Sequence, residues 1–160
     1  MHTESHQWLT HRLGRPMGIR VYGHWGMPIL AFPTSGGDEW ELEGQSMVGA
    51  LSEFIEGGRI KLFCVGSNGD QSFYNKHAHP LHRSWMQKQW DEYIRWEAIP
   101  FIHSHCRGLP AILTMGASLG AYHAANTCFK HPDAVRGCFA LSPCETSSSS
   151  RPSPSAVTST

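Results

Sequence analysis

The sequence lacks long apolar runs and an excess of either charge. Its longest apolar runs, residues 28–33 and Ile60–Val65, are far shorter than the roughly 20 residues with which a helix crosses a bilayer. Thirteen Lys and Arg balance thirteen Asp and Glu, which gives a formal net charge of zero. No strong electrostatic field therefore favours nucleic acid or an anionic lipid surface, and we expect neither a membrane-spanning segment nor a nucleic-acid partner.

The sequence also lacks clustered cysteines and a secretion signal. Its 5 cysteines are widely spaced and include no C-x-x-C pair, which favours reduced thiols over a disulfide framework or a cysteine zinc site. His2, Glu4 and His6 stand where a signal peptide needs a basic segment followed by an apolar one. These features predict a cytoplasmic protein.

The composition changes after Cys144. Residues 145–160 include seven Ser, three Thr and two Pro, and only two aliphatic side chains. Such a segment buries too little apolar surface to offset the entropy that it loses on ordering. We therefore predict one domain over residues 1–144 and a disordered Ser- and Pro-rich tail over residues 145–160.

Within residues 1–144, apolar runs alternate with segments of helical period. Five strands are predicted, at residues 18–22, Met27–Phe32, Ile60–Val65, residues 111–115 and residues 135–141. Helices are predicted over residues 47–55, from about residue 82 to a break or kink at Pro100, and over Leu119–Lys130. Uniformly apolar strands that alternate with helices indicate an α/β fold with a mainly parallel sheet and helices on both faces.

The most informative motif is G-x-S-x-G at residues 116–120. It directly follows a predicted strand and opens a predicted Ala-rich helix, which is the setting of a nucleophile elbow. Its glycines, Gly116 and Gly120, permit a turn that is too tight for neighbouring Cβ atoms. The motif predicts that Ser118 is a nucleophile whose hydroxyl lies at the positive end of the helix, where developing oxyanion charge is favoured.

Acyl transfer also needs donors for the oxyanion. The backbone N–H of Leu119, the residue after the nucleophile, is expected to be one of them. The second is expected from the Gly-rich loop that follows an early strand, through Ser35 or Gly36. An ordinary Gly-rich turn is the alternative interpretation of this loop.

Several segments together resemble a known family. From about Arg12 to Leu141 the chain is similar to the esterases of the α/β-hydrolase superfamily, in the branch related to esterase D and the antigen 85 mycolyltransferases. The resemblance rests on residues 18–23, 32–37, 72–75, 79–80 and 115–123.

The resemblance implies an eight-stranded, mostly parallel sheet and a catalytic triad in the chain order Ser, Asp or Glu, His. It implies hydrolysis of a carboxylic ester or thioester of a small molecule, with neither cofactor nor metal. The implied substrate pocket contains Thr34, Gly37, Ser72, Phe73 and Tyr74.

Only the nucleophile of this triad has a match in the chain. The family's acid and histidine lie beyond the fifth parallel strand, and the candidates after Ser118 are few: His123, His131, Asp133 and Glu145. In a straight helix His123 lies about 7 Å along the axis from Ser118 and His131 near 18 Å, too far for a general base. We therefore expect a truncated esterase without its C-terminal strands and without a triad acid or His.

Upstream histidines allow two further interpretations. His77, His79 and His82 follow the third predicted strand, on the same edge of the sheet as the elbow, so one of them could replace the missing base. The same cluster could bind a metal, but neither a nearby Cys nor a regular element supports it. A solvated polar loop is favoured, and His103 and His105 are interpreted in the same way.

Three functions from different classes remain open. The first is a serine hydrolase with Ser118 as nucleophile and an incomplete triad. The second is a catalytically inactive α/β-hydrolase remnant that binds a small molecule or a protein partner. The third is a His-based metal-binding module. In each case residues 135–141 form an apolar strand without the cover that further strands would give, and we expect self-association through it.

Overall fold

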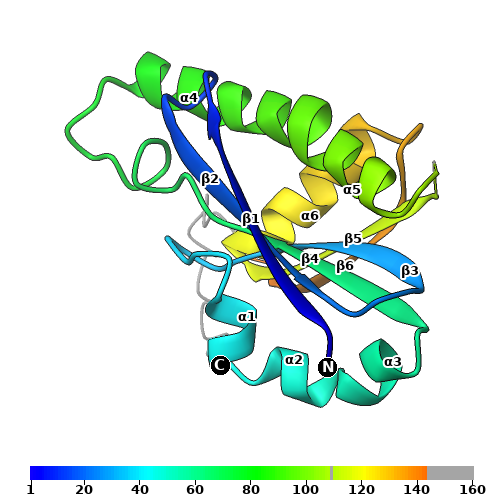
Figure 1. The fold of residues 1–160 in the computed structure, drawn as a ribbon. Helices are drawn as coiled ribbons and strands as arrows, with labels where there is room; N and C mark the ends of the chain where they lie inside the picture. The colour runs from blue at the N-terminus through cyan, green and yellow to red at the C-terminus, as the bar shows by residue number, and fades with distance from the viewer. Residues whose placement is uncertain (109, 144–160) are drawn as a thin grey trace, which may run out of the picture.

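A computed structural model of the protein describes residues 1–108 and 110–143 (Figure 1). Short apolar runs form most strands of its single mixed sheet. The strand order is β1-β2-β4-β3-β5-β6. The strands are β1 (Thr3–Thr10), β2 (Arg15–Tyr22), β3 (Met27–Phe32), β4 (Ile60–Val65), β5 (Ile112–Ser118) and β6 (Val135–Pro143). The tail predicted over residues 145–160 lies outside the described residues.

The sheet is parallel where the sequence predicted it to be. Strands β4, β3, β5 and β6 are neighbours and run in one direction, whereas β1 pairs antiparallel with β2, and β2 with β4. The prediction of an α/β fold with a mainly parallel sheet is therefore confirmed. Because parallel strands end at one edge, Phe32, Val65 and Ser118 all lie toward the same side of the molecule.

The sequence predicted five strands, but the sheet has six, and the strand that was not predicted is β1. Its residues alternate between exposed and partly buried, but the partly buried side chains include Glu4, His6 and Trp8. Alternation of polar with polar residues carries no hydrophobic signal of period two. The hairpin to β2 closes at Gly14, which has a φ of 65° and donates its N–H to the carbonyl of Thr10 at 3.0 Å.

The helix predicted over residues 47–55 is also different in the structure. It is divided into two short helices, α2 (Met47–Ala50) and α3 (Ser52–Glu56), and a third short helix, α1 (Glu41–Gly44), precedes them. Ser46 has a left-handed φ of 63°, which interrupts the helical path between α1 and α2. Val48 and Ile55 are buried as expected, but Phe54 is 42% exposed.

Pro100 does not break the long helix. The helix α4 (Pro80–Tyr93) passes through a π-helical turn, η1 (Ile94–Ala98), into α5 (Ile99–His105). Pro100 directly follows the π-helical turn, in which the hydrogen-bond pattern of the α-helix is locally altered. A single helical element thus runs along one face of the sheet (Figure 1).

Helices cover both faces, as predicted. One face packs against α4, α5 and α6 (Leu119–Lys130), and its core contains Leu30, Phe32 and Phe63 together with Trp90 and Tyr93. The other face packs against α1, α2 and α3. Its core contains Ile29, Ala31, Leu62, Val48 and Ile55. Alternate residues of β3 and β4 point to opposite cores, so nearly every residue of both central strands is apolar, Lys61 excepted.

Candidate active site

Ser118 lies at the junction of β5 and α6 in a strained backbone conformation. Its φ of 54° and ψ of −119° fall in a region that side chains rarely adopt. Its side chain makes no capping hydrogen bond to the helix that it precedes. The hydroxyl is thus held at a strand-to-helix turn, next to the N–H groups at the start of α6.

The two glycines of the motif are required by close backbone packing. A Cβ atom on Gly116 would lie 2.3 Å from the carbonyl carbon of Gly120. A Cβ atom on Gly120 would lie 2.5 Å from the carbonyl oxygen of Phe32 and 2.6 Å from that of Pro33. Distances this short cannot be accommodated without moving the backbone. The first turn of α6 therefore packs directly against the start of the loop over residues 33–37.

That loop presents unpaired backbone donors. Gly36 has a φ of 73°, and within the described part of the chain the N–H groups of Ser35 and Gly36 donate to no protein acceptor. The loop is anchored by Glu41, whose carboxylate accepts from Thr34 N at 2.7 Å and from Thr34 Oγ1 at 3.0 Å. Sequence reasoning missed Glu41, because nothing local to the sequence relates it to Thr34.

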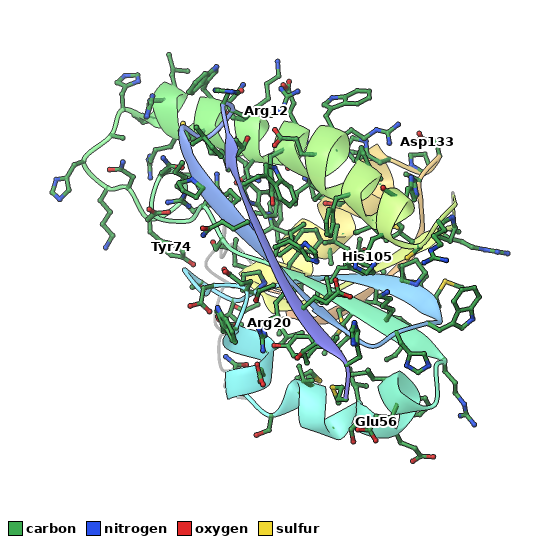
Figure 2. All side chains as sticks on the ribbon, in the orientation of Figure 1. Arg12, Arg20, Glu56, Tyr74, His105 and Asp133 are labelled. Atoms are coloured by element: carbon green, nitrogen blue, oxygen red, sulfur yellow. The ribbon has the colours of Figure 1, made fainter. Side chains whose placement is uncertain are left out.

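The loop after β4 contributes to the same region. The Tyr74 hydroxyl, labelled in Figure 2, donates to Ser35 Oγ. The Phe73 ring lies against Tyr122 of α6, with ring centroids 5.8 Å apart. Ser72 is buried, and its hydroxyl donates to the carbonyl of Asn68 at 3.1 Å. The structure therefore brings Phe73 and Tyr74 to the elbow and the Gly-rich loop, while Ser72 bonds within its own loop.

Two hollows open beside these loops. A small one of about 30 Å³ is lined by Thr34, Glu41, Met115, Gly116 and Ala117, among others. A larger one of about 430 Å³ includes Gly36, Gly37 and Glu39 in its lining. Glu39 was also missed from the sequence. Its carboxylate occupies the space in which a Cβ atom on Gly18 would lie, 2.1 Å from Oε1.

The histidines of this region are engaged elsewhere. His123 is buried, 4.2 Å from the Trp90 ring between centroids, and burial lowers its pKa to about 4, so it is neutral at pH 7. Its Nδ1 lies 3.5 Å from Gln87 Nε2, and across residues 1–108 and 110–143 no hydrogen bond joins it to Ser118. Desolvation also lowers the pKa of His131.

The histidines after β4 do not form the cluster that was considered. His79 caps α4, where its Nδ1 accepts from the N–H of Leu81 at 3.2 Å, and His82 stacks on Trp85. His77 is exposed. None of the three belongs to a group of metal-ligand geometry among the described residues.

A mixed sheet covered by helices on both faces, with a strand, sharp turn and helix at its carboxyl edge, defines an α/β-hydrolase fold. Comparison with family models gives the narrower class. Residues 10–155 match the family described as "Putative esterase", and the chain belongs to that family. The resemblance stated from the sequence is therefore confirmed. No helix of the described residues is long and apolar enough to cross a membrane.

Solved structures of esterases share this fold at low sequence identity. A ferulic acid esterase aligns with a TM-score of 0.71 and 11% identity, over 96% of this chain and 62% of its own. An S-formylglutathione hydrolase from Agrobacterium tumefaciens aligns with a TM-score of 0.61 and 14% identity, over 85% and 56%.

MPT51 from Mycobacterium tuberculosis aligns with a TM-score of 0.61 and 16% identity, over 84% of this chain and 48% of its own. The chain thus spans about half to three fifths of the length of these structures. A search of curated protein sequences gives no significant match.

Proposed function

We propose that this chain carries the nucleophile and the oxyanion donors of a serine esterase that acts on small-molecule carboxylic esters or thioesters. The observation that carries the proposal is Ser118, held at a φ of 54° between two glycines that backbone packing requires. Residue types that permit such a turn, and a strained non-glycine residue at its centre, are typical of a nucleophile elbow. Membership of the esterase family supports the reaction class.

Two backbone N–H groups supply the proposed oxyanion hole. The N–H of Leu119 belongs to the first residue of α6, which has no partner within its own helix. Ser35 or Gly36 provides the second donor, and the bond from Tyr74 to Ser35 holds that loop near the elbow. Two such donors aimed at one oxygen stabilise the tetrahedral intermediate of acyl transfer.

We propose that the described residues lack a general base for Ser118. His123 is the histidine nearest to Ser118 in sequence, and it is buried, neutral and directed at Gln87. Without a base the hydroxyl is a weak nucleophile, and the donors alone leave about 10³ to 10⁴ of rate enhancement over water. We therefore expect ester hydrolysis by this chain to be much slower than that of an esterase with a complete triad.

The proposal is tested by labelling the folded chain with a fluorophosphonate probe and locating the adduct by mass spectrometry. We expect slow labelling of Ser118 that is lost in urea and in Ser118→Ala, and that persists in Ser84→Ala, which removes an exposed hydroxyl from α4. Hydrolysis of p-nitrophenyl acetate measures turnover in parallel. An adduct on another residue, or equal labelling of Ser118→Ala, would contradict the assignment of the nucleophile.

The state of the cysteine thiols is relevant to the cellular location of the protein. Cys64, Cys106, Cys128 and Cys138 are free, and burial raises the pKa of the Cys64 thiol to about 12. Reduced, unreactive thiols are typical of proteins kept in a reducing compartment. We propose a cytoplasmic location, which fractionation of the native source organism's cells would test.

A further inference from the structure

A second group of polar side chains lies on the edge strand β1, which three strands, β2, β4 and β3, separate from β5 and Ser118. The pairing of β1 with β2, and of β2 with β4, sets Glu4 level with Phe63 and His6 level with Val65 of β4. Residues two apart in a strand share a face, and this face of β1 packs on α5. His105, labelled in Figure 2, is the last residue of α5 and reaches the same point.

Three potential ligand atoms converge there. Oε2 of Glu4 lies 2.9 Å from His6 Nε2 and 3.0 Å from His105 Nε2. Glu4, His6 and His105 are the residues that have metal-ligand geometry within the described ranges, since their ligand atoms all lie within 4.8 Å of one another. Three ligand atoms around a tetrahedral zinc ion, each at about 2.0–2.2 Å from it, are about 3.3–3.6 Å apart. A shift of a few tenths of an ångström in the Glu4 carboxylate would bring its distances to His6 Nε2 and His105 Nε2 to those of a tetrahedral zinc site.

The surroundings hold these side chains in place. The His6 ring lies 5.0 Å from the Phe101 ring, and the His105 ring lies 5.5 Å from the Phe63 ring, between centroids. The other carboxylate oxygen of Glu4, Oε1, lies 2.7 Å from His2 Nε2, so His2 also restrains the Glu4 side chain. A charged oxygen and two imidazole nitrogens form a donor set that zinc accepts.

One side of the group is open. Glu4 and His105 line a cavity of about 550 Å³ that also contains His2, Lys61 and Arg107. Three protein ligands beside an open cavity leave the fourth corner of a tetrahedron to solvent.

We propose that Glu4, His6 and His105 bind a zinc ion, with the fourth position facing this cavity. The site is separate from the esterase elbow and does not depend on the proposed function. It joins the edge strand β1 to α5 through residues 101 positions apart in sequence. Zinc binding should therefore also stabilise the folded chain against unfolding.

Titration of the full chain with zinc chloride, followed by calorimetry and by thermal unfolding, tests the proposal. We expect one zinc ion per chain and a higher melting temperature. His6→Gln and His105→Gln, which each keep a hydrogen-bonding side chain, should weaken binding at least tenfold, since even residues that only orient a zinc ligand contribute about 10- to 100-fold. His77→Gln, which removes an exposed loop histidine, should bind as the unmodified chain does.

A readout that does not depend on the variants is the visible spectrum of the unmodified chain with cobalt(II), which reports tetrahedral coordination. Failure of the unmodified chain to bind zinc at one equivalent would overturn the proposal. So would affinity that is lost in His77→Gln and retained in both His6→Gln and His105→Gln. If His105→Gln fails to fold, His6→Gln and the cobalt spectrum still decide the question.

Discussion

The backbone strain at Ser118 predicts that glycine at this position stabilises the protein while removing the proposed nucleophile. A non-glycine residue at a φ of 54° and ψ of −119° costs about 1–3 kcal/mol. Glycine removes that cost but loses about 0.5–1 kcal/mol through the greater entropy of the unfolded chain. The hydroxyl caps no helix N–H, so its removal costs little. Ser118→Gly should therefore raise the free energy of unfolding by about 1 kcal/mol, or about 3 °C in Tm for a domain of this size.

Two control variants separate strain from other effects. Ser118→Ala removes the same hydroxyl but keeps a Cβ atom, so it should retain the strain and gain no stability. Gly36→Ala is the converse test, because Gly36 has a φ of 73° and a Cβ atom added there would have nothing within 4 Å. It should lose about 1 kcal/mol through backbone conformation alone.

Urea denaturation of the three variants, monitored by tryptophan fluorescence, gives these free energies. Both Ser118 variants should also lose fluorophosphonate labelling. If Ser118→Gly proves no more stable than Ser118→Ala, the turn is not strained and the elbow assignment loses its main physical support.

Three further predictions follow from packing, charge and the sheet edge. Gly120→Ala should lower the free energy of unfolding, measured by urea denaturation, by about 1–3 kcal/mol. The added Cβ would lie 2.5 Å from the carbonyl oxygen of Phe32, and this steric overlap outweighs the roughly 1 kcal/mol gained in helix propensity. Burial lowers the pKa of His123 from 6.5 to about 4, so between these pH values the unfolded chain binds a proton that the folded chain does not. The free energy of unfolding should therefore fall by on the order of 3 kcal/mol as the pH falls from 6.5 to 4. His123→Gln should make the free energy of unfolding less dependent on pH in this range. Strand β6 pairs on one side only within the described residues, and Phe139 and Leu141 are 54% and 45% exposed. Light scattering should therefore detect self-association that increases with protein concentration and that Phe139→Lys reduces. A monomer at every concentration would contradict this prediction.

The parallel half of the fold was predictable because its signals are local. Strands β3 and β4 are buried on both faces, so nearly every residue in them is apolar and the run itself marks the strand. The elbow was predictable for a similar reason. Gly116, Ser118 and Gly120 are close in sequence, so the motif can be recognised without knowledge of the contacts that Gly120 makes with Phe32 and Pro33.

The elements that were missed or altered depend on contacts that are distant in sequence. Trp8 donates from β1 to Glu97 at 2.9 Å, and Thr10 donates to the same carboxylate at 2.8 Å. These bonds hold a polar strand against the π-helical turn, and no periodicity of β1 alone reveals them. Arg95 likewise pairs with Asp133, and Asp91 with Lys130, 38 and 39 residues away in the sequence.

The same distinction separates the two halves of an esterase site. The conformation of Ser118, the proposed nucleophile, is fixed by packing of the motif on Phe32 and Pro33, so such a turn can form whether or not a base is present. A base and its acid are positioned by tertiary contacts and leave no comparable local signature. Probe labelling and the stability of Ser118→Gly therefore report on the elbow itself, whereas the rate of ester hydrolysis reports on the base. A strained and reactive Ser118 with slow turnover is the combination that this structure predicts.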